Sequence, residues 1–155
     1  MKLSNRTEYG LRALVTLAER SGGAPMSTRQ IAEIEGIPEP FLDQIMVLLR
    51  RAGIVKSVRG VNGGFLLAQS PDRVSVGEVV RVLEGSLLLI GCVDEENGDM
   101  WCERTPICHT RKVWVKLNEG ITKALGSLTL AEVVETEEPT SQAQAGKGGW
   151  GGSYH

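Results

Sequence analysis

The 155-residue chain is poor in histidine, and it has no long apolar run. Its two histidines are His109 and His155, and it has neither a GxxxxGK[ST] phosphate-binding loop nor a GxSxG nucleophile elbow. We therefore expect that it is not an enzyme. No apolar run approaches the roughly 20 residues of a transmembrane helix, and residues 1–6 are polar, unlike a secretory signal peptide. These absences predict a cytoplasmic protein without membrane association.

Cysteine is also scarce, and its placement is the most informative feature of the chain. All three cysteines, Cys92, Cys102 and Cys108, fall within one short window. An odd number of thiols cannot all pair within one chain, so a closed set of disulfides is excluded. Thiols stay reduced in the cytoplasm and can serve there as ligands. The window therefore predicts a metal or cluster site, a redox switch, or three buried structural thiols.

Acidic residues are missing from one long stretch of a chain whose net charge is −2. No Asp or Glu lies between Gln44 and Pro71, whereas that stretch contains Arg50, Arg51, Lys56 and Arg59. A basic patch on an acidic protein can supply contacts to phosphates. The same residues can equally form a solvated helix end, so charge alone leaves nucleic-acid binding open.

Apolar periodicity and capping residues predict helices in the first third of the chain. Apolar residues at helical spacing predict a helix over residues 7–20, with a second, short helix after a capping box at Ser27 to Gln30. In that short helix we expect Ile31, Ala32 and Ile34 to point inward. A glycine turn leads into a third helix over about residues 38–52. Two such helices and their turn are typical of a helix-turn-helix, although other helix pairs share the pattern.

Two segments typical of strands follow the third helix directly, at residues 54–59 and 65–68. Between them lies Asn62-Gly63, which is typical of a tight hairpin whose two turn residues have positive φ. A helix-turn-helix followed by a hairpin is a winged helix-turn-helix. We therefore predict a mainly α fold in which residues 1–85 form such a domain, with Arg59 near the tip of the wing.

The predicted DNA contacts are the polar residues of the helix-turn-helix and of the wing. Gln44 can pair with adenine N6 and N7, and Asp43 can accept a hydrogen bond from cytosine N4. Phe41 can equally be a core residue. The predicted contacts are Arg29, Pro40, Phe41, Asp43, Gln44, Arg50, Arg59, Asn62 and Gly63.

A second helical region follows the cysteine window, which we assign to residues 86–108. Apolar residues at spacings of three and four predict a long helix from about Thr105 and a short last helix after Thr129, both within residues 105–135. The apolar side of so long a helix needs a partner, and a second copy is the economical one, so we predict a homodimer. The Gln- and Gly-rich residues 136–155 predict a disordered tail.

The spacing of the cysteines does not by itself define a metal site. Nine residues separate the first two and five the last two, unlike a zinc ribbon or a bacterial ferredoxin. Three thiolates leave a tetrahedral site one ligand short, and His109 is the nearest candidate. If residues 108–109 begin the helix, their side chains diverge by roughly 100°, which makes joint binding awkward. A carboxylate or a residue of a second subunit is the alternative.

Taken together, these features resemble the IscR, NsrR and RirA group of winged-helix repressors, which has relatives such as CymR that lack a cluster. The resemblance covers about residues 1–135. It is carried by the three cysteines and by MKLSNRTEYGLRAL, GIPEPFLDQIMVLLRRAGIVKSVRGVNGGFLL, VGEVVRVLEG and ITKALGSLTLAEVV. It implies a homodimer that crosses through its long C-terminal helices. It also implies a palindromic operator read by the second helix of the helix-turn-helix, with the wing on the backbone or minor groove.

The resemblance further implies an iron–sulfur cluster, [2Fe–2S] or [4Fe–4S], on the three cysteines. The fourth ligand of IscR is a histidine three residues after the last cysteine, and Arg111 occupies that position here. In NsrR-like members an acidic residue near the N-terminus of the partner subunit takes this role, and the matching residue is Glu8. The resemblance thus favours Glu8 over His109. A protein partner that inserts the cluster or alters the folding state is also expected.

The sequence therefore predicts a homodimeric transcriptional repressor whose operator binding is controlled by an iron–sulfur cluster. Its signal would be iron–sulfur status, iron, redox state or NO. Two alternatives remain open. One is a cluster-free regulator of the CymR type that uses its thiols as a redox switch, and the other is a zinc-stabilised protein-interaction module.

Overall fold

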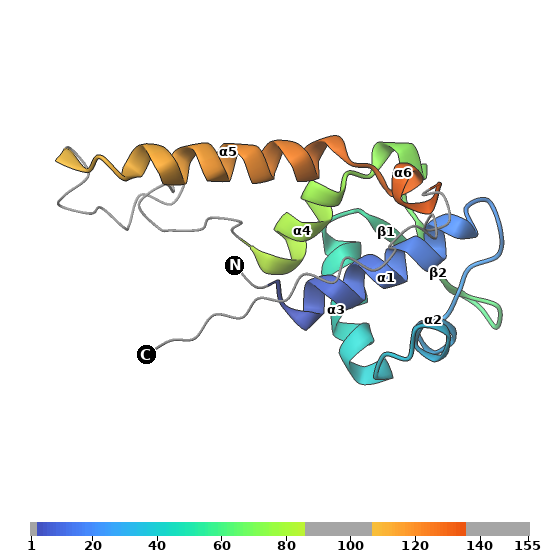
Figure 1. Cartoon of the computed structure of the whole chain (residues 1–155). Coiled ribbons are helices and arrows are strands. Elements are labelled where there is room, and N and C mark those ends of the chain that lie inside the picture. Colours follow the sequence, from blue (N-terminus) through green and yellow to red (C-terminus); the bar gives the residue numbers. More distant parts are fainter. Residues whose placement is uncertain (1–2, 86–106, 136–155) are drawn as a thin grey trace, which may run out of the picture.

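The computed structural model describes residues 3–85 and 107–135, and its helices form one packed group from which a single long helix extends (Figure 1). The elements in chain order are α1 (Asn5–Glu19), α2 (Thr28–Glu35), α3 (Glu39–Arg51), β1 (Val55–Val58), β2 (Gly64–Leu67), the 3-10 helix η1 (Pro71–Arg73), α4 (Val76–Glu84), α5 (Arg111–Ser127) and α6 (Leu130–Val134). None of the described helices is long and apolar enough to cross a membrane. The mainly helical fold with one hairpin is the predicted one.

Three of the helices, α2, α4 and α6, begin at side-chain caps. The Oγ of Ser27 accepts a hydrogen bond from the amide of Gln30 at 3.2 Å, and Oε1 of Gln30 accepts from the amide of Ser27 at 2.8 Å. Thr129 forms the same reciprocal box at α6. At α4 the Ser75 hydroxyl accepts from the amide of Glu78 at 3.1 Å. Each bond satisfies a helix-terminal N–H that would otherwise lack a partner.

The core lies where α1, α3 and α4 meet, and α2, the hairpin and α6 close it. Each fully buried aliphatic side chain contributes about 1.5–3 kcal/mol relative to an exposed one. The largest such residues are Leu14, Ile31, Leu42, Ile45, Met46, Leu49, Leu83, Leu130, Val55, Val74, Val79 and Val80. The prediction that Ile34 points inward is wrong, because its side chain is 53% exposed. The buried side of α2 is centred between Ile31 and Ala32, and Ile34 lies about 110° from that centre.

The wing is confirmed as an antiparallel hairpin of β1 and β2, but its predicted turn is wrong. The pairing of Val58 with Gly64 leaves a loop over residues 59–63, which contains a hydrogen bond from the Gly63 amide to the Gly60 carbonyl at 3.0 Å. Neither Asn62 nor Gly63 has a positive φ. Gly63 is required for space instead, since an added Cβ would overlap the Val58 carbonyl oxygen and lie 2.9 Å from that of Gly60. A tight two-residue turn needs positive φ, whereas this longer loop does not.

Backbone hydrogen bonds hold the wing against the start of α2. The amide of Met26 donates to the Phe65 carbonyl at 3.1 Å, and the amide of Phe65 donates to the Met26 carbonyl at 2.7 Å. Gly64 permits this close approach, because a Cβ there would overlap the Met26 carbonyl group and lie 2.7 Å from the Ser27 nitrogen. The position of the wing relative to the helix-turn-helix is therefore set by main-chain contacts.

Gly64→Ala is expected to lower the free energy of unfolding by about 1–3 kcal/mol, because the added methyl group overlaps backbone that has no rotamer through which to move away. Urea denaturation followed by circular dichroism measures the loss. Gly60→Ala is the matched control: it also has a positive φ, 123°, but nothing lies within 4 Å of the added Cβ. Its loss should be clearly smaller, and equal losses would contradict the close contact with Met26.

The C-terminal end of α5 is attached to the winged domain, whereas its N-terminal end extends away from that domain (Figure 1). The amide of Leu130 donates to the Val74 carbonyl at 2.9 Å, and the amide of Val76 donates to the Leu128 carbonyl at 2.8 Å. A Cβ on Gly77 would lie 3.0 Å from the nitrogen of Gly126, so α4 and α5 are in close contact there. The direction of α5 is thus fixed relative to the helix-turn-helix.

Candidate nucleic-acid interface and metal site

The exposed side of α3 carries the predicted DNA-reading residues. Pro40, Asp43, Gln44 and Arg50 are exposed, whereas the opposite side of the helix is buried in the core. Arg50 lies in the last turn, together with Arg51, where the partial negative charge of the helix C-terminus favours a cation. This side of α3 can present hydrogen-bonding groups to a base edge without loss of core packing.

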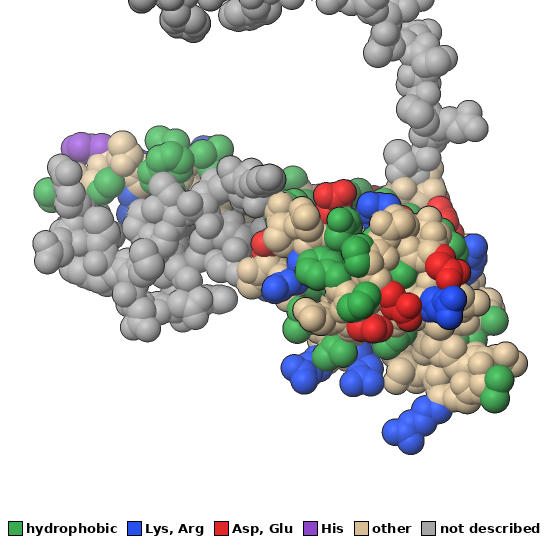
Figure 2. All heavy atoms as spheres, turned by 90° about the horizontal axis from the view of Figure 1, so that it is seen from below, with side chains coloured by type: hydrophobic (Ala, Val, Ile, Leu, Met, Phe, Trp, Pro, Cys, Tyr) green, Lys and Arg blue, Asp and Glu red, His purple; other side chains and the backbone are tan. Residues whose placement is uncertain are grey.

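The wing adds exposed basic residues to this surface. Lys56, Arg59 and Asn62 are exposed, and Gly63 is half-buried. Among the described residues, neither Lys56 nor Arg59 takes part in an ion pair. Figure 2 views the molecule from below, and Lys and Arg side chains project from its lower edge. Cations without an acidic partner are available to phosphate oxygens.

Arg29, in the first turn of α2, differs from Lys56 and Arg59 because it has an acidic partner. Its Nε lies 3.0 Å from Oε1 of Glu33, and the two side chains are 75% and 65% exposed. The hydrogen bond that Arg29 donates to Glu33 raises the pKa of Arg29, and the charges of Glu33 and Glu39 act in the same direction. Arg29 is therefore a cation that must leave Glu33, or share it, to contact a phosphate.

Phe41 lies at the boundary between the DNA-reading surface and the core. Its ring is half-buried, packs against core residues and meets the ring of Tyr9 edge to face, with 5.7 Å between the centroids and 89° between the planes. Both of the roles considered for this residue fit the position. Its contact with DNA stays a prediction.

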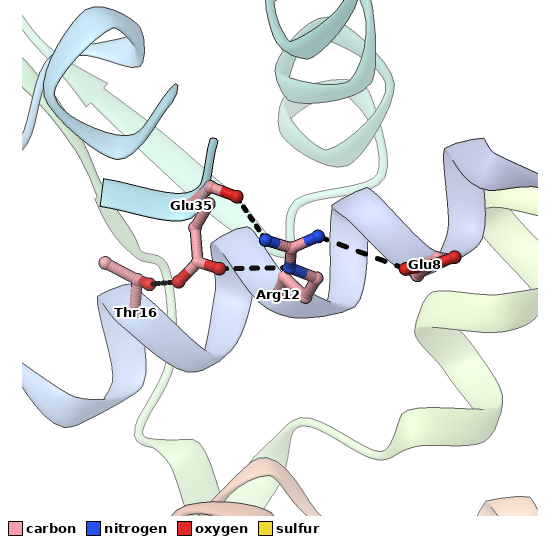
Figure 3. A network of polar contacts seen from close by, with 4 residues as sticks. All are labelled: Glu8, Arg12, Thr16 and Glu35. Carbon is pink, nitrogen blue, oxygen red and sulfur yellow. Dashed lines mark hydrogen bonds and ion pairs between the residues drawn. The ribbon is translucent and has the colours of Figure 1, made fainter. Parts of the chain in front are cut away.

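A polar network joins α1 to the end of α2 (Figure 3). The guanidinium of Arg12 donates through Nε to Oε2 of Glu35 at 3.1 Å and through Nη2 to the Glu35 carbonyl. The Thr16 hydroxyl donates to the other carboxylate oxygen of Glu35, and Nη1 of Arg12 lies 3.9 Å from Glu8. The sequence does not predict this network. The one sign of it in the sequence is that Glu8, Arg12 and Thr16 recur at every fourth position of α1, and nothing in the sequence indicates that Glu35 is their partner.

The candidate metal ligands are only partly among the described residues. Cys92 and Cys102 lie outside them. Cys108 is half-buried, with its Sγ 3.2 Å from Oγ1 of Thr110, and His109 is exposed. Among residues 3–85 and 107–135, no three His, Cys, Asp or Glu side chains are placed to hold a metal ion.

The position at which α5 begins affects whether Cys108 and His109 can bind the same metal ion. The helix begins at Arg111 rather than near Thr105, so Cys108 and His109 both precede it. The divergence of about 100° between neighbouring helical side chains therefore does not apply to this pair. His109 is a better candidate for the fourth ligand than the predicted helix allowed.

Glu8 is the other candidate for the fourth ligand, and it is accessible. It lies in the first turn of α1, where its side chain is 63% exposed. The end of α4 is tied to the same helix terminus, because the amide and hydroxyl of Ser4 donate to Oε1 of Glu84 at 2.6 and 2.7 Å. The end of α4 thus lies next to the start of the helix that carries Glu8.

The helix pair, the hairpin behind it and the exposed polar side of α3 define a winged helix-turn-helix protein. The family model of Rrf2, described as an iron-dependent transcriptional regulator, matches residues 3–136. The chain belongs to the Rrf2 family. It is therefore a transcriptional regulator and not an enzyme, as predicted.

Individual relatives agree with this assignment. A Synechocystis protein provisionally named an HTH-type transcriptional regulator is 39% identical over 135 residues, which are 86% of this chain and 87% of that one. The structure of CymR, the global cysteine regulator of B. subtilis, is 32% identical with a TM-score of 0.72, over 89% of this chain and 99% of CymR. The structure of T. potens IscR is 38% identical with a TM-score of 0.72, over 94% of both chains. The resemblance to the IscR and CymR group is confirmed, and these relatives leave the cofactor open.

Proposed function

We propose that the protein is a homodimeric transcriptional repressor that binds a palindromic operator and is controlled by an iron–sulfur cluster. The observation that carries DNA binding is the exposed polar side of α3 next to a wing with unpaired cations. The side chains of α3 would read base edges, and Arg59, Lys56 and Arg50 would contact phosphates or the minor groove.

The proposed dimer is supported by the exposed apolar residues of α5. None of the 17 residues of this helix is buried, and Val113 and Leu117 are 53% and 46% exposed. Val113 and Leu117 lie on the part of α5 that extends away from the winged domain, and Leu128, 38% exposed, lies at the attached end. A second α5 would cover this surface, and a two-fold axis there gives two reading helices for the two halves of a palindrome.

The proposed cluster is supported by the chemistry of the donor set. Thiolates suit iron–sulfur clusters, and Cys92, Cys102 and Cys108 would supply three of them. Glu8 of the partner subunit or His109 would complete the set, and the exposure of both agrees with this role. When bound, the cluster would supply a site whose integrity depends on iron, oxidants or NO. A partly non-cysteine ligand set is more labile than four thiolates, which suits a sensor.

The similarity to CymR favours one second candidate, a cluster-free regulator whose thiols act as a redox switch. The zinc-stabilised interaction module is less well supported, because the family is one of transcriptional regulators. The protein partner that inserts the cluster stays a prediction.

DNA binding is tested with the full chain purified without oxygen. Fluorescence anisotropy at fixed salt compares a fragment of its own promoter with a shuffled sequence of equal length, since affinity depends steeply on salt. A clear preference for the promoter, with a footprint symmetric about a two-fold axis, is expected. Equal affinity for both fragments would overturn the proposal.

Arg59→Ala is expected to weaken operator binding by about 1–3 kcal/mol, because the side chain contacts DNA from the wing. The measurement is operator affinity at matched salt. Arg73→Ala is the control, since Arg73 is an exposed arginine on η1, which packs against α6. If the Arg59 variant binds the operator as tightly as the wild-type protein does, Arg59 is not a contact.

A further inference from the structure

We propose that Arg12 is a positioning residue for DNA recognition: it fixes the turn between α2 and α3 through Glu35 and thereby sets the start of the reading helix. The proposal rests on the proposed function, since it concerns the same DNA-reading surface. Arg12 itself lies on α1, outside the helix-turn-helix formed by α2 and α3.

The contacts of Arg12 converge on a single residue. Glu35 is the last residue of α2, and Arg12 bonds both its carboxylate and its main-chain carbonyl. Thr16 donates to the remaining carboxylate oxygen. The side chains of Glu35 and Arg12 are 20% and 41% exposed, so these charge-assisted bonds are partly shielded from water and stronger than those of a fully exposed pair. A carboxylate and a carbonyl held together leave Glu35 little freedom to rotate.

The chain beyond Glu35 has few residues in which to adjust. Gly36 adopts the left-handed conformation at φ 63°, the amide of Ile37 donates to the Ala32 carbonyl at 3.0 Å, and α3 starts at Glu39. The orientation of Glu35 therefore determines where α3 begins. Only residues 36–38 separate the residue held by Arg12 from the reading helix.

A second contact reaches α3 directly. The Arg12 guanidinium lies 5.9 Å from the centroid of the Tyr9 ring, and the Tyr9 ring meets Phe41 edge to face in the first turn of α3. Arg12 thus supports the turn from both sides, through Glu35 before it and through Tyr9 and Phe41 after it. Lysine keeps the charge but lacks the planar fork that bonds two acceptors at once.

The contact of Arg12 with Glu8 is weaker than its contacts with Glu35. The Nη1–Oε1 distance to Glu8 is 3.9 Å and the Glu8 side chain is 63% exposed, against 3.1 Å and 20% for Glu35. Glu8 can therefore leave Arg12 and bind another group while Arg12 still holds Glu35 and the turn. The position of the turn depends on Glu35.

The test combines two measurements on folded, dimeric full-length protein. The first is hydrogen exchange of the Ile37, Phe41 and Leu42 amides, which bond to Ala32 and Pro38 carbonyls. The second is the ratio of operator affinity to shuffled-DNA affinity at matched salt. Arg12→Lys is expected to speed exchange of these amides and to lower the affinity ratio by about tenfold, the effect of losing a partly buried charge-assisted hydrogen bond. Because it keeps the charge, a purely electrostatic role for Arg12 would leave both readouts unchanged.

Matched variants at Thr16 separate the network from general loss of packing. Thr16→Val keeps the shape but removes the donor, and it should shift both readouts in the same direction as Arg12→Lys. Thr16→Ser keeps the donor, so its amide exchange and its affinity ratio should stay close to those of wild type. Unchanged exchange or an unchanged affinity ratio in Arg12→Lys, with the wild type preferring its operator, overturns this proposal alone. A wild-type protein with no operator preference overturns the proposed function as well.

Discussion

Leu117→Lys is expected to convert the protein from a dimer into a monomer and to weaken operator binding by about 100-fold or more, the loss typical when two linked binding sites are separated. Leu117 lies in the middle of α5, 46% exposed, in a helix with no buried residue. Apolar area of this kind is favourable to bury and unfavourable to leave in water. A lysine placed between two copies of α5 would need to lose its hydration without gaining a partner.

The measurements are molar mass by light scattering and affinity for a full palindrome and for a single half-site. The variant should have the mass of one chain and should bind both DNA fragments with similar, low affinity. Thr122→Lys is the control, because it adds the same side chain at an exposed polar position of α5, about 140° around the helix from Leu117. Thr122→Lys should remain dimeric. A dimeric Leu117→Lys protein would show that another surface joins the two chains.

The parts of the fold that the sequence predicts are those stabilised by residues close together in the chain. The Ser27 capping box needs only residues three positions apart, and it forms as predicted. The apolar residues of α5 recur at every third or fourth position, so the helix itself is predictable. Its first residue is not, because no capping hydrogen bond from the side chain of Thr110 marks the start at Arg111.

The parts that the sequence does not predict depend on how separate elements approach each other. The prediction of a two-residue turn at Asn62-Gly63 was wrong because loop length follows from the register of the two strands. That register is set partly by the pairing of Met26 with Phe65. The network around Arg12 depends on α1 and α2 lying side by side, which leaves no mark on the residues near Glu35. Exposed residues of α3 were predictable, since a helix with one apolar side must turn the other outward.

The cysteine site is predicted by resemblance and by the number of thiols rather than by geometry, since Cys92 and Cys102 lie outside the described residues. Its test is therefore chemical. Protein reconstituted with iron and sulfide without oxygen is expected to be coloured and to contain both elements in a fixed ratio to the dimer. Cys102→Ser should abolish the colour and the iron content, because a hydroxyl replaces a thiolate ligand. Absorption and Mössbauer spectra distinguish [2Fe–2S] from [4Fe–4S].

The fourth ligand is decided by comparing Glu8→Gln with His109→Ala in reconstituted protein. The variant that removes the true ligand should lose its cluster faster in air than wild type does, whereas the other variant should match wild type. If both variants keep the cluster as long as wild type does, both residues are excluded as ligands. Cluster loss is expected to change operator affinity by about 5–150-fold, the range of a coupling of 1–3 kcal/mol between two sites. A protein that stays colourless and free of iron would contradict the cluster and favour the CymR-like switch. In that case mild oxidation of wild type, but not of Cys102→Ser, should change operator affinity, because the variant lacks one of the thiols that the switch would oxidise.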